Sequence, residues 1–150
     1  MLGPKSLKCF VCLLLAALSL TLTPGCTELF DSSLLEGKAE EMFSCVIARD
    51  EEGASKLLYP GSGGEGFADR FAELCGLFPI TESPELELRH YNASKNVGFG
   101  SSTVYYGEYR TEIGGEVFSI IMQWRAANGK EGFEVFRVQR EFDLIPTETD

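Results

Sequence analysis

The chain has 150 residues, which fits one domain, and its 44% hydrophobic and 24% charged residues are typical of a globular protein. It carries 13 basic and 23 acidic residues, a net charge of −10. Such a surface repels phosphate backbones and anionic headgroups, which argues against nucleic-acid binding. Cationic peptides, metal cations and sugars remain compatible partners, although the simplest interpretation of the charge is solubility.

The first residues have the composition of an export leader. Residues 1–8 carry positive charge and no acid, and Phe10 to Leu22 is a run of 13 apolar and small hydroxyl residues. That run is short for a membrane span, which takes about 20 residues. The pattern predicts a signal peptide over residues 1–25 that is removed from the mature protein.

The junction Leu22-Thr23-Pro24-Gly25-Cys26 resembles the lipobox of bacterial lipoproteins. Gly25 and Cys26 match that motif, whereas Leu22 lies one place early and Pro24 is unusual before the small residue. The resemblance implies a diacylglyceryl group on Cys26 and anchoring to the outer face of the bacterial cytoplasmic membrane. Two alternatives are plain cleavage by the ordinary signal peptidase, which gives a secreted protein, and an uncleaved anchor.

Cleavage before Cys26 changes the charge and fixes the distance from the membrane. Loss of Lys5 and Lys8 leaves 11 basic residues against 23 acidic ones, a net charge of −12. Residues 26–32 form a short tether, which reaches roughly 25 Å when fully extended. The acidic domain would therefore stay close to a bilayer to which charge does not attract it, so lipid must supply the anchoring.

Three helices are predicted before any strand. Ser33 and Glu36 have the spacing of a capping box, and the first helix carries one apolar stripe: Leu35, Ala39, Met42, Phe43, Val46 and Ile47. A second short helix follows from Asp50 through Leu58. The third has the stripe Phe67, Phe71, Leu74, Cys75 and Phe78, and Pro79 ends it.

The segment Gly61–Gly66 matches the spacing G-x-G-x-x-G of dinucleotide-binding loops. That interpretation needs a preceding strand, but a helix precedes the segment here. Glu65 would also place a negative charge where pyrophosphate binds. We therefore interpret the segment as a loop between helices, and the sequence predicts no cofactor.

From Leu86 onward the pattern becomes that of strands. Leu86, Leu88 and His90 alternate with polar residues, and two further strands run over residues 103–113 and 116–126, separated by the hairpin pair Gly114-Gly115. Asn128-Gly129 predicts a second hairpin before a last strand, Phe133 to Phe142. The apolar residues of that strand change parity midway, which indicates a bulge or burial on both faces.

This order predicts an α+β fold in which N-terminal helices pack on a curved four-stranded antiparallel sheet, with one domain over residues 33–142 and a polar tail at 143–150. The element order, three short helices and aromatic-rich hairpins resemble the nuclear-transport-factor-like, or cystatin-like, superfamily. They also resemble small uncharacterised bacterial lipoproteins that combine a lipobox with such a domain. Another α+β roll and a plain helix-on-sheet layer fold are the alternatives.

Four residues are candidates for a pocket between helices and sheet: His90, Tyr105, Tyr109 and Trp124. Alternation places His90, the single histidine, on the face of Leu86 and Leu88 toward the helices. Some enzymes of the resembled superfamily use a histidine inside the fold as general base, with a carboxylate such as Asp69 to orient it. The simpler interpretations are a hydrogen-bonded structural histidine and aromatic rings that form the core.

Cys45 and Cys75 both fall in helical patterns and could form a disulfide in an exported domain or remain buried thiols. Two cysteines with one histidine do not make a zinc site, so no metal is predicted.

Three functions remain open from the sequence. The first is a lipid-anchored extracytoplasmic module that binds a small ligand or an envelope protein. The second is an envelope structural protein without a small ligand, and the third is an isomerase- or dehydratase-type enzyme that uses His90. No catalytic motif is found, which favours a function other than catalysis.

Overall fold

The computed structural model describes residues 31–98 and 100–141. The chain divides into two units, Met1–Asp31 and Ser32–Asp150, and all described residues except Asp31 belong to the second. The leader, Cys26, most of the tether and the tail from residue 142 lie outside the described residues. Among the residues described, no helix is both long and apolar enough to cross a membrane.

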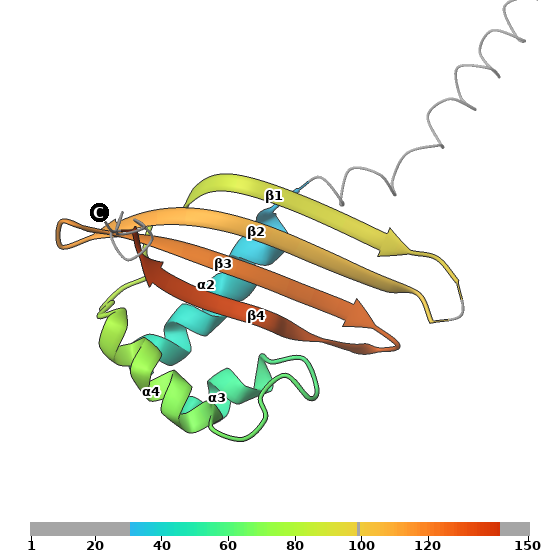
Figure 1. The fold of residues 1–150 in the computed structure, drawn as a ribbon, viewed down its shortest axis with the longest axis horizontal. Coiled ribbons are helices and arrows are strands. Elements are labelled where there is room, and N and C mark those ends of the chain that lie inside the picture. Colours follow the sequence, from blue (N-terminus) through green and yellow to red (C-terminus); the bar gives the residue numbers. More distant parts are fainter. Residues whose placement is uncertain (1–30, 99, 142–150) are drawn as a thin grey trace, which may run out of the picture. The chain divides into compact units, whose positions relative to one another are not determined.

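The domain is α+β, with three described helices followed by a four-stranded antiparallel sheet of order β1-β2-β3-β4 (Figure 1). The helices are α2 (Ser33–Ala48), α3 (Glu51–Lys56) and α4 (Phe67–Leu77). The strands are β1 (Glu87–Asn96), β2 (Ser102–Ile113), β3 (Glu116–Ala127) and β4 (Lys130–Arg140). Helix α2 runs across one face of the sheet, and α3 and α4 lie on the β4 side.

Helix α2 forms because its apolar residues recur at three- and four-residue spacing. Five of the six predicted stripe residues are buried, and Ile47 is 38% exposed. The predicted capping box is wrong by one residue, because Ser33 is already helical and Ser32 is the N-cap. The Ser32 hydroxyl donates a hydrogen bond of 2.7 Å to the Glu36 carboxylate.

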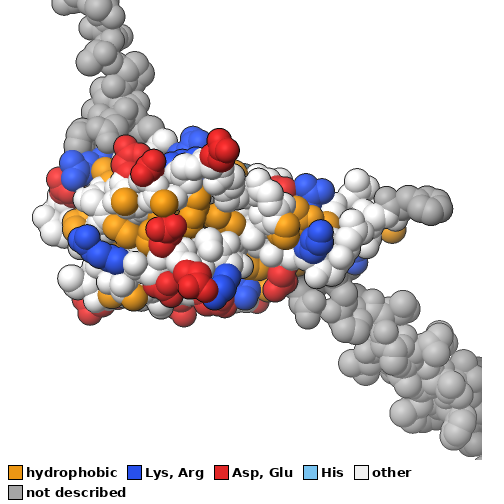
Figure 2. All heavy atoms as spheres, turned by 90° about the horizontal axis from the view of Figure 1, so that it is seen from below, with side chains coloured by type: hydrophobic (Ala, Val, Ile, Leu, Met, Phe, Trp, Pro, Cys, Tyr) orange, Lys and Arg blue, Asp and Glu red, His pale blue; other side chains and the backbone are white. Residues whose placement is uncertain are grey.

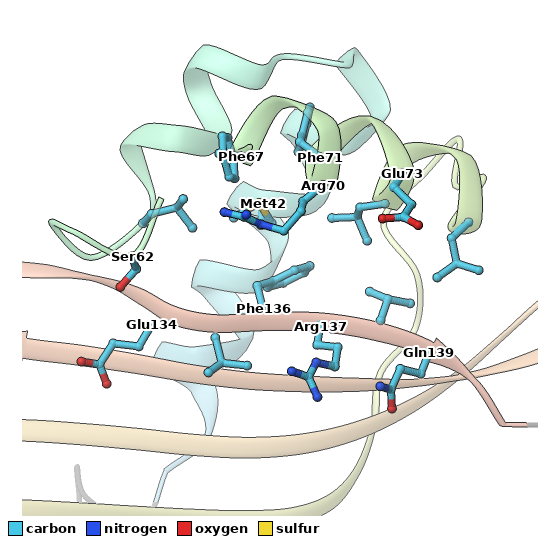
Figure 3. Close-up of a pocket in the computed structure, with 15 residues that line it drawn as sticks. Met42, Ser62, Phe67, Arg70, Phe71, Glu73, Glu134, Phe136, Arg137 and Gln139 are labelled. Carbon is cyan, nitrogen blue, oxygen red and sulfur yellow. The ribbon is translucent and has the colours of Figure 1, made fainter. Parts of the chain in front are cut away.

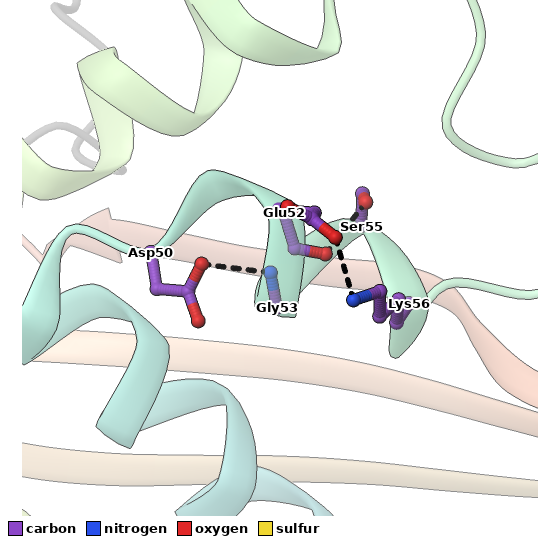
Figure 4. A network of polar contacts seen from close by, with 5 residues as sticks. All are labelled: Asp50, Glu52, Gly53, Ser55 and Lys56. Atoms are coloured by element: carbon purple, nitrogen blue, oxygen red, sulfur yellow. Dashed lines mark hydrogen bonds and ion pairs between the residues drawn. The ribbon is translucent and has the colours of Figure 1, made fainter.

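Helix α3 begins where an acidic side chain caps it. The Asp50 carboxylate accepts a hydrogen bond of 2.9 Å from the backbone N–H of Gly53 (Figure 4). One turn later Lys56 forms an ion pair of 2.7 Å with Glu52, and Ser55 donates to the Glu52 carbonyl. The Asp50 side chain thus satisfies a backbone donor at the start of the helix.

Both predicted hairpins are present as two-residue turns. Gly114-Gly115 joins β2 to β3, and Asn128-Gly129 joins β3 to β4. All four residues have positive φ, between 54° and 83°, as turns that match the twist of the flanking strands require. These turns set the register of β2, β3 and β4.

Two bulges interrupt the sheet. In β1 the register shifts between Leu88 and His90, and in β4 the pairs Gln123↔Val135 and Trp124↔Phe133 leave Glu134 as an extra residue. A bulge reverses which side chains face which side of the sheet. The second bulge confirms the expected change of parity in the last strand, which begins at Lys130 and ends at Arg140.

The core lies between α2 and the face of the sheet toward it, which we call the inner face. Its fully buried large side chains come from both layers: Leu35, Met42, Phe43, Phe78, Tyr109, Phe118, Ile120, Met122 and Phe133. Trp124 is 3% exposed and its ring lies 5.1 Å from the Lys38 ammonium. Gly107 leaves no room for a side chain, since a Cβ there would lie 2.6 Å from the Tyr109 ring and 2.7 Å from the Leu35 side chain of α2.

Candidate functional site

A groove with a volume of about 590 Å³ runs between α4 and the edge strand β4 (Figure 3). We call this feature the groove. Helix residues that line it include Met42, Phe67, Phe71, Leu74 and Leu77, and the strand contributes residues 134–139. A second hollow, lined by residues 85–87 and 110–112, measures about 370 Å³, and four of these six residues are charged.

The groove exists because α4 packs chiefly on the other helices rather than on the sheet. Its main neighbours are α2 and α3, and it lies beyond β4 when the sheet is viewed face-on (Figure 1). Strand β4 ends the sheet, so within the described part of the chain no further strand fills the space next to it. Side chains from α4 and β4 therefore approach each other across an open channel.

The interior of the groove is apolar and its rim is polar. Met42, Phe71 and Val138 are buried beneath it, while Leu74 and Leu77 are half-buried on the wall that α4 forms. Figure 2 views this side of the molecule and shows hydrophobic side chains gathered along its middle between acidic and basic ones. Such a lining is typical of ligand sites, in which apolar surface gives affinity and a few polar groups fix orientation.

Six consecutive residues of β4, Glu134–Gln139, all line the groove. Because side chains of a strand alternate between faces, one channel meets six in a row only if it follows the strand's edge. Figure 3 agrees: Phe136 points toward α4, and Glu134, Arg137 and Gln139 point to the other side. The edge backbone of β4 is therefore part of the groove.

The segment after α3 covers one end of this edge. Phe133 donates its N–H to the Leu57 carbonyl at 2.8 Å and accepts from the Tyr59 N–H at 2.9 Å. These bonds make a parallel bridge between Leu58 and Phe133. A turn closed by the Ser62 N–H on the Tyr59 carbonyl then takes the chain away from β4.

The bulge residue Glu134 anchors a polar cluster at the same end. Its carboxylate accepts hydrogen bonds from Arg125 at 2.8 Å and from Gln123 at 2.6 Å. The Arg125 guanidinium also lies 5.3 Å from the Tyr59 ring centre. The hydrogen bond from Arg125 lowers the pKa of Glu134, so this carboxylate is a poor proton donor near neutral pH.

Replacing Glu134 by glutamine should lower the free energy of unfolding at neutral pH by about 0.5–1 kcal/mol, because the Arg125 pair is partly exposed. The pKa of Glu134 is lower in the folded chain than in the unfolded one, so its contribution is complete above about pH 4.5. It is lost as the pH falls further. Urea unfolding between neutral pH and about pH 3 should show the two proteins converging.

Glu73→Gln is the matched control, since Glu73 lies on the groove rim and makes no ion pair with any described residue. Its difference from the wild type at neutral pH should stay below about 0.5 kcal/mol. A difference for Glu134→Gln that grows toward acid would contradict the assignment of the pair.

The glycine loop is bound by a cation of its own chain. Arg70 donates to the Gly63 carbonyl at 2.6 Å and to the Glu65 carbonyl at 3.1 Å. Carbonyl oxygens therefore point toward the first turn of α4, where a phosphate-binding loop presents N–H groups. This geometry agrees with the interpretation of the segment as a structural loop.

Tyr105, Tyr109 and Trp124 share the inner face, as expected, but none lines the groove. Tyr109 and Trp124 are 1% and 3% exposed, and Tyr105 packs partly buried against the core. Burial raises the pKa of the Tyr109 hydroxyl far above its usual range. These rings act as core beneath α2.

His90 lies on the outer face, opposite to the prediction. The bulge after Leu88 reverses the side of the following residues, so His90 pairs with Glu108 and its ring contacts Tyr106 at 6.0 Å. His90 is exposed, and the Tyr106 hydroxyl is instead bonded to Glu108. The alternation misled because it assumed an uninterrupted strand. Asp69, the proposed orienter, is in the first turn of α4.

Cys45 and Cys75 are free thiols, each half-buried. The Cys75 thiol points at the Val46 carbonyl, 3.8 Å away, and burial raises the pKa of both thiols. Thiols of raised pKa react slowly, which suits packing rather than chemistry. Within the described ranges no group of three histidine, cysteine or acidic side chains is arranged to hold a metal.

The sequence predicts the apolar residues of α4 that line the groove only as one face of a helix. Phe67, Phe71 and Leu74 do form the predicted stripe of α4, yet only Phe71 is buried. Periodicity reports that a helix has an apolar face and not what covers that face. The spacing of apolar residues could therefore not predict the groove.

Comparisons with protein-family models, with curated proteins and with solved structures found no significant match to this chain. The resemblance to the cystatin-like superfamily thus stays a prediction from element order. The groove and the residues that form it are therefore the structural features that indicate a function.

Proposed function

We propose that this chain is a lipid-anchored extracytoplasmic binding module and that the groove between α4 and β4 is its binding site. The observation that carries the proposal is an apolar channel that stays open in an otherwise well-packed acidic domain. Apolar surface that faces water costs free energy, so an open channel of this kind on a folded domain usually marks a place where something binds.

The leader and Cys26 support the proposed location outside the cytoplasmic membrane. Residues 1–25 have the charge and the short apolar run of a signal peptide, and the junction resembles a lipobox. In this proposal the helices and sheet form a cystatin-like roll, held close to the outer face of the cytoplasmic membrane by the short tether. The partner is then an envelope component or a molecule that diffuses to the membrane.

The lining of the groove suits binding better than catalysis. Arg70 is bound to loop carbonyls, and Glu134 is held ionised by Arg125. The remaining charged groups, Glu73 and Arg137, stand on the rim, where water screens them. Apolar complementarity is what this lining offers to a ligand.

Two substitutions in the full chain, expressed in a bacterium with a lipoprotein pathway, test the proposal together. Cys26→Ser should abolish incorporation of a labelled fatty acid, because the thiol is the acceptor, and should release the chain from the membrane fraction. A photo-crosslinking phenylalanine analogue in place of Leu77, inside the groove, should yield a crosslinked product in intact cells. Gel mobility and the fatty-acid label report both results.

The controls are Cys45→Ser, which should keep the fatty-acid label, and the same photo-crosslinker at Ala72, an exposed position of α4 outside the groove. Label that persists in Cys26→Ser would refute the anchor. Equal crosslinking from both positions, or none from position 77, would refute the groove as the site.

A further inference from the structure

We infer that the occupant of the groove is an extended segment of another protein, which pairs with the free edge of β4 as a fifth strand. The segment is apolar at alternate positions and carries net positive charge. This inference rests on the proposed function, since it names the ligand class of the same groove.

The hydrogen-bonding phase of β4 is fixed by its hairpin. The two-residue turn makes Ala127↔Lys130 a hydrogen-bonded pair, and such pairs alternate with pairs whose backbone groups point apart. Phe133 lies three positions after Lys130, so this alternation makes it point its N–H and C=O groups away from β3. It does so, because both groups are bonded to the segment after α3.

The same alternation resumes beyond the bulge at Glu134. Met122↔Phe136 is then a pair whose backbone groups point apart, so Phe136 and Val138 direct their N–H and C=O groups into the groove. Among the described residues, no backbone group outside the sheet bonds to either of them. A row of donors and acceptors beside an apolar wall is what an added strand requires.

The side chains beside this edge match a strand of alternating character. Phe136 and Val138 pair with the buried residues Met122 and Ile120, so both lie on the inner side. Leu74 and Leu77 of α4 line the same groove. Every second side chain of an added strand would enter this apolar space. The side chains between them would emerge on the outer side, near Arg137 and Gln139.

The chain already pairs one short segment with this edge. Leu58 forms its parallel bridge with Phe133, and Pro60 and the following turn end the pairing there. The edge from Phe136 to Val138 continues the same line. An added strand would thus extend an interface that β4 already makes within its own chain.

A second copy of this domain fits the edge poorly. Two-fold pairing of β4 with its equivalent would place both α4 helices on the same face of the joined sheet. Each α4 lies beyond its own β4 and would overlap the space that the partner's α4 occupies (Figure 1). A single extended segment avoids this conflict and fits a groove of about 590 Å³.

The acidic charge of this chain determines that the bound segment carries net positive charge. The four charged residues that line the groove balance, Arg70 and Arg137 against Glu73 and Glu134, whereas residues 51–77, which include its helical wall, have five acidic residues and two basic ones. Of those two, Arg70 is bound to loop carbonyls and Lys56 to Glu52. The whole chain is also strongly acidic, so a cationic segment is attracted and an anionic one repelled.

The test uses the full wild-type chain in nanodiscs of zwitterionic lipid and a fluorescent probe peptide of about eight residues that alternates valine and lysine. Binding is read by fluorescence anisotropy against empty nanodiscs. A peptide N-methylated at every second amide keeps one hydrogen-bonding edge and should bind like the parent. A peptide N-methylated at every amide has no such edge and should lose at least about tenfold in affinity.

Three further experiments test where the peptide binds, whether its charge matters and which backbone groups it contacts. Leu77→Arg should weaken the parent peptide by at least about tenfold, whereas Ala72→Arg, the same change on the exposed side of α4, should leave it unchanged. Replacing every lysine of the probe by glutamate should weaken binding. Hydrogen exchange followed by NMR should be fast at Phe136 and Val138, slow at Arg137, and slowed at the first two when the peptide binds.

The inference is overturned if the fully methylated peptide binds as tightly as the parent, if Leu77→Arg has no effect, or if the parent does not bind. If the glutamate peptide binds as tightly as the lysine-containing parent, the bound segment need not be positively charged, and that part of the inference is overturned. A crosslink from position 77 in cells, combined with failure of these peptides, would leave the groove as a binding site and exclude an added strand. If position 77 gives no crosslink and the peptides do not bind, the proposed function is refuted as well.

Discussion

Replacing Phe43 by alanine should lower the free energy of unfolding by about 3–5 kcal/mol, the usual cost of truncating a buried aromatic side chain. Phe43 is fully buried, and its ring lies 5.9 Å from the rings of both Phe78 and Phe136. The ring fills the point where α2, the end of α4 and β4 meet. Its neighbours belong to different elements and cannot collapse together into the vacated space.

Urea unfolding at neutral pH measures this loss, with Leu34→Ala as the control in the same helix. Leu34 is 42% exposed, so its truncation should cost less than about 1 kcal/mol. Similar losses for the two variants would show that α2 does not pack as the structure has it. Because Phe136 lines the groove, Phe43→Ala should also reduce binding there.

Gly132→Ala is expected to cost about 3 kcal/mol of unfolding free energy, at the upper end for overpacking. A Cβ at Gly132 would lie 2.3 Å from the Tyr59 backbone nitrogen and 2.4 Å from the Leu58 carbonyl carbon. These are main-chain atoms held by the bridge to Phe133, so they cannot rotate away as a side chain does. The methyl group must push the segment after α3 off the edge of β4.

The same chemical change at Gly37 should have the opposite sign. Gly37 is exposed in α2, and a Cβ there meets nothing within 4 Å, so alanine should stabilise by about 0.5–1 kcal/mol through its helix propensity. Thermal unfolding of the two variants side by side measures the contrast. A Gly132→Ala protein as stable as the wild type would rule out the pairing of this segment with β4.

The local elements of this domain could be predicted because short-range chemistry decides them. The stripe of α2 and the turns at Gly114-Gly115 and Asn128-Gly129 depend on neighbours a few residues away. The order of helices and then strands joined by tight turns left an antiparallel meander as the simple solution. The acidic charge and the leader-like start are properties of composition and need no fold.

The face of His90 and the site itself were decided by the tertiary structure. A bulge is invisible to a period-two pattern, and the one after Leu88 moved His90 to the outer face. Whether Phe71, Leu74 and Leu77 would be covered depended on where α4 came to rest, which its packing on α2 and α3 sets. The groove is thus the space that long-range packing leaves beside an edge strand, and no residue pattern encodes it alone.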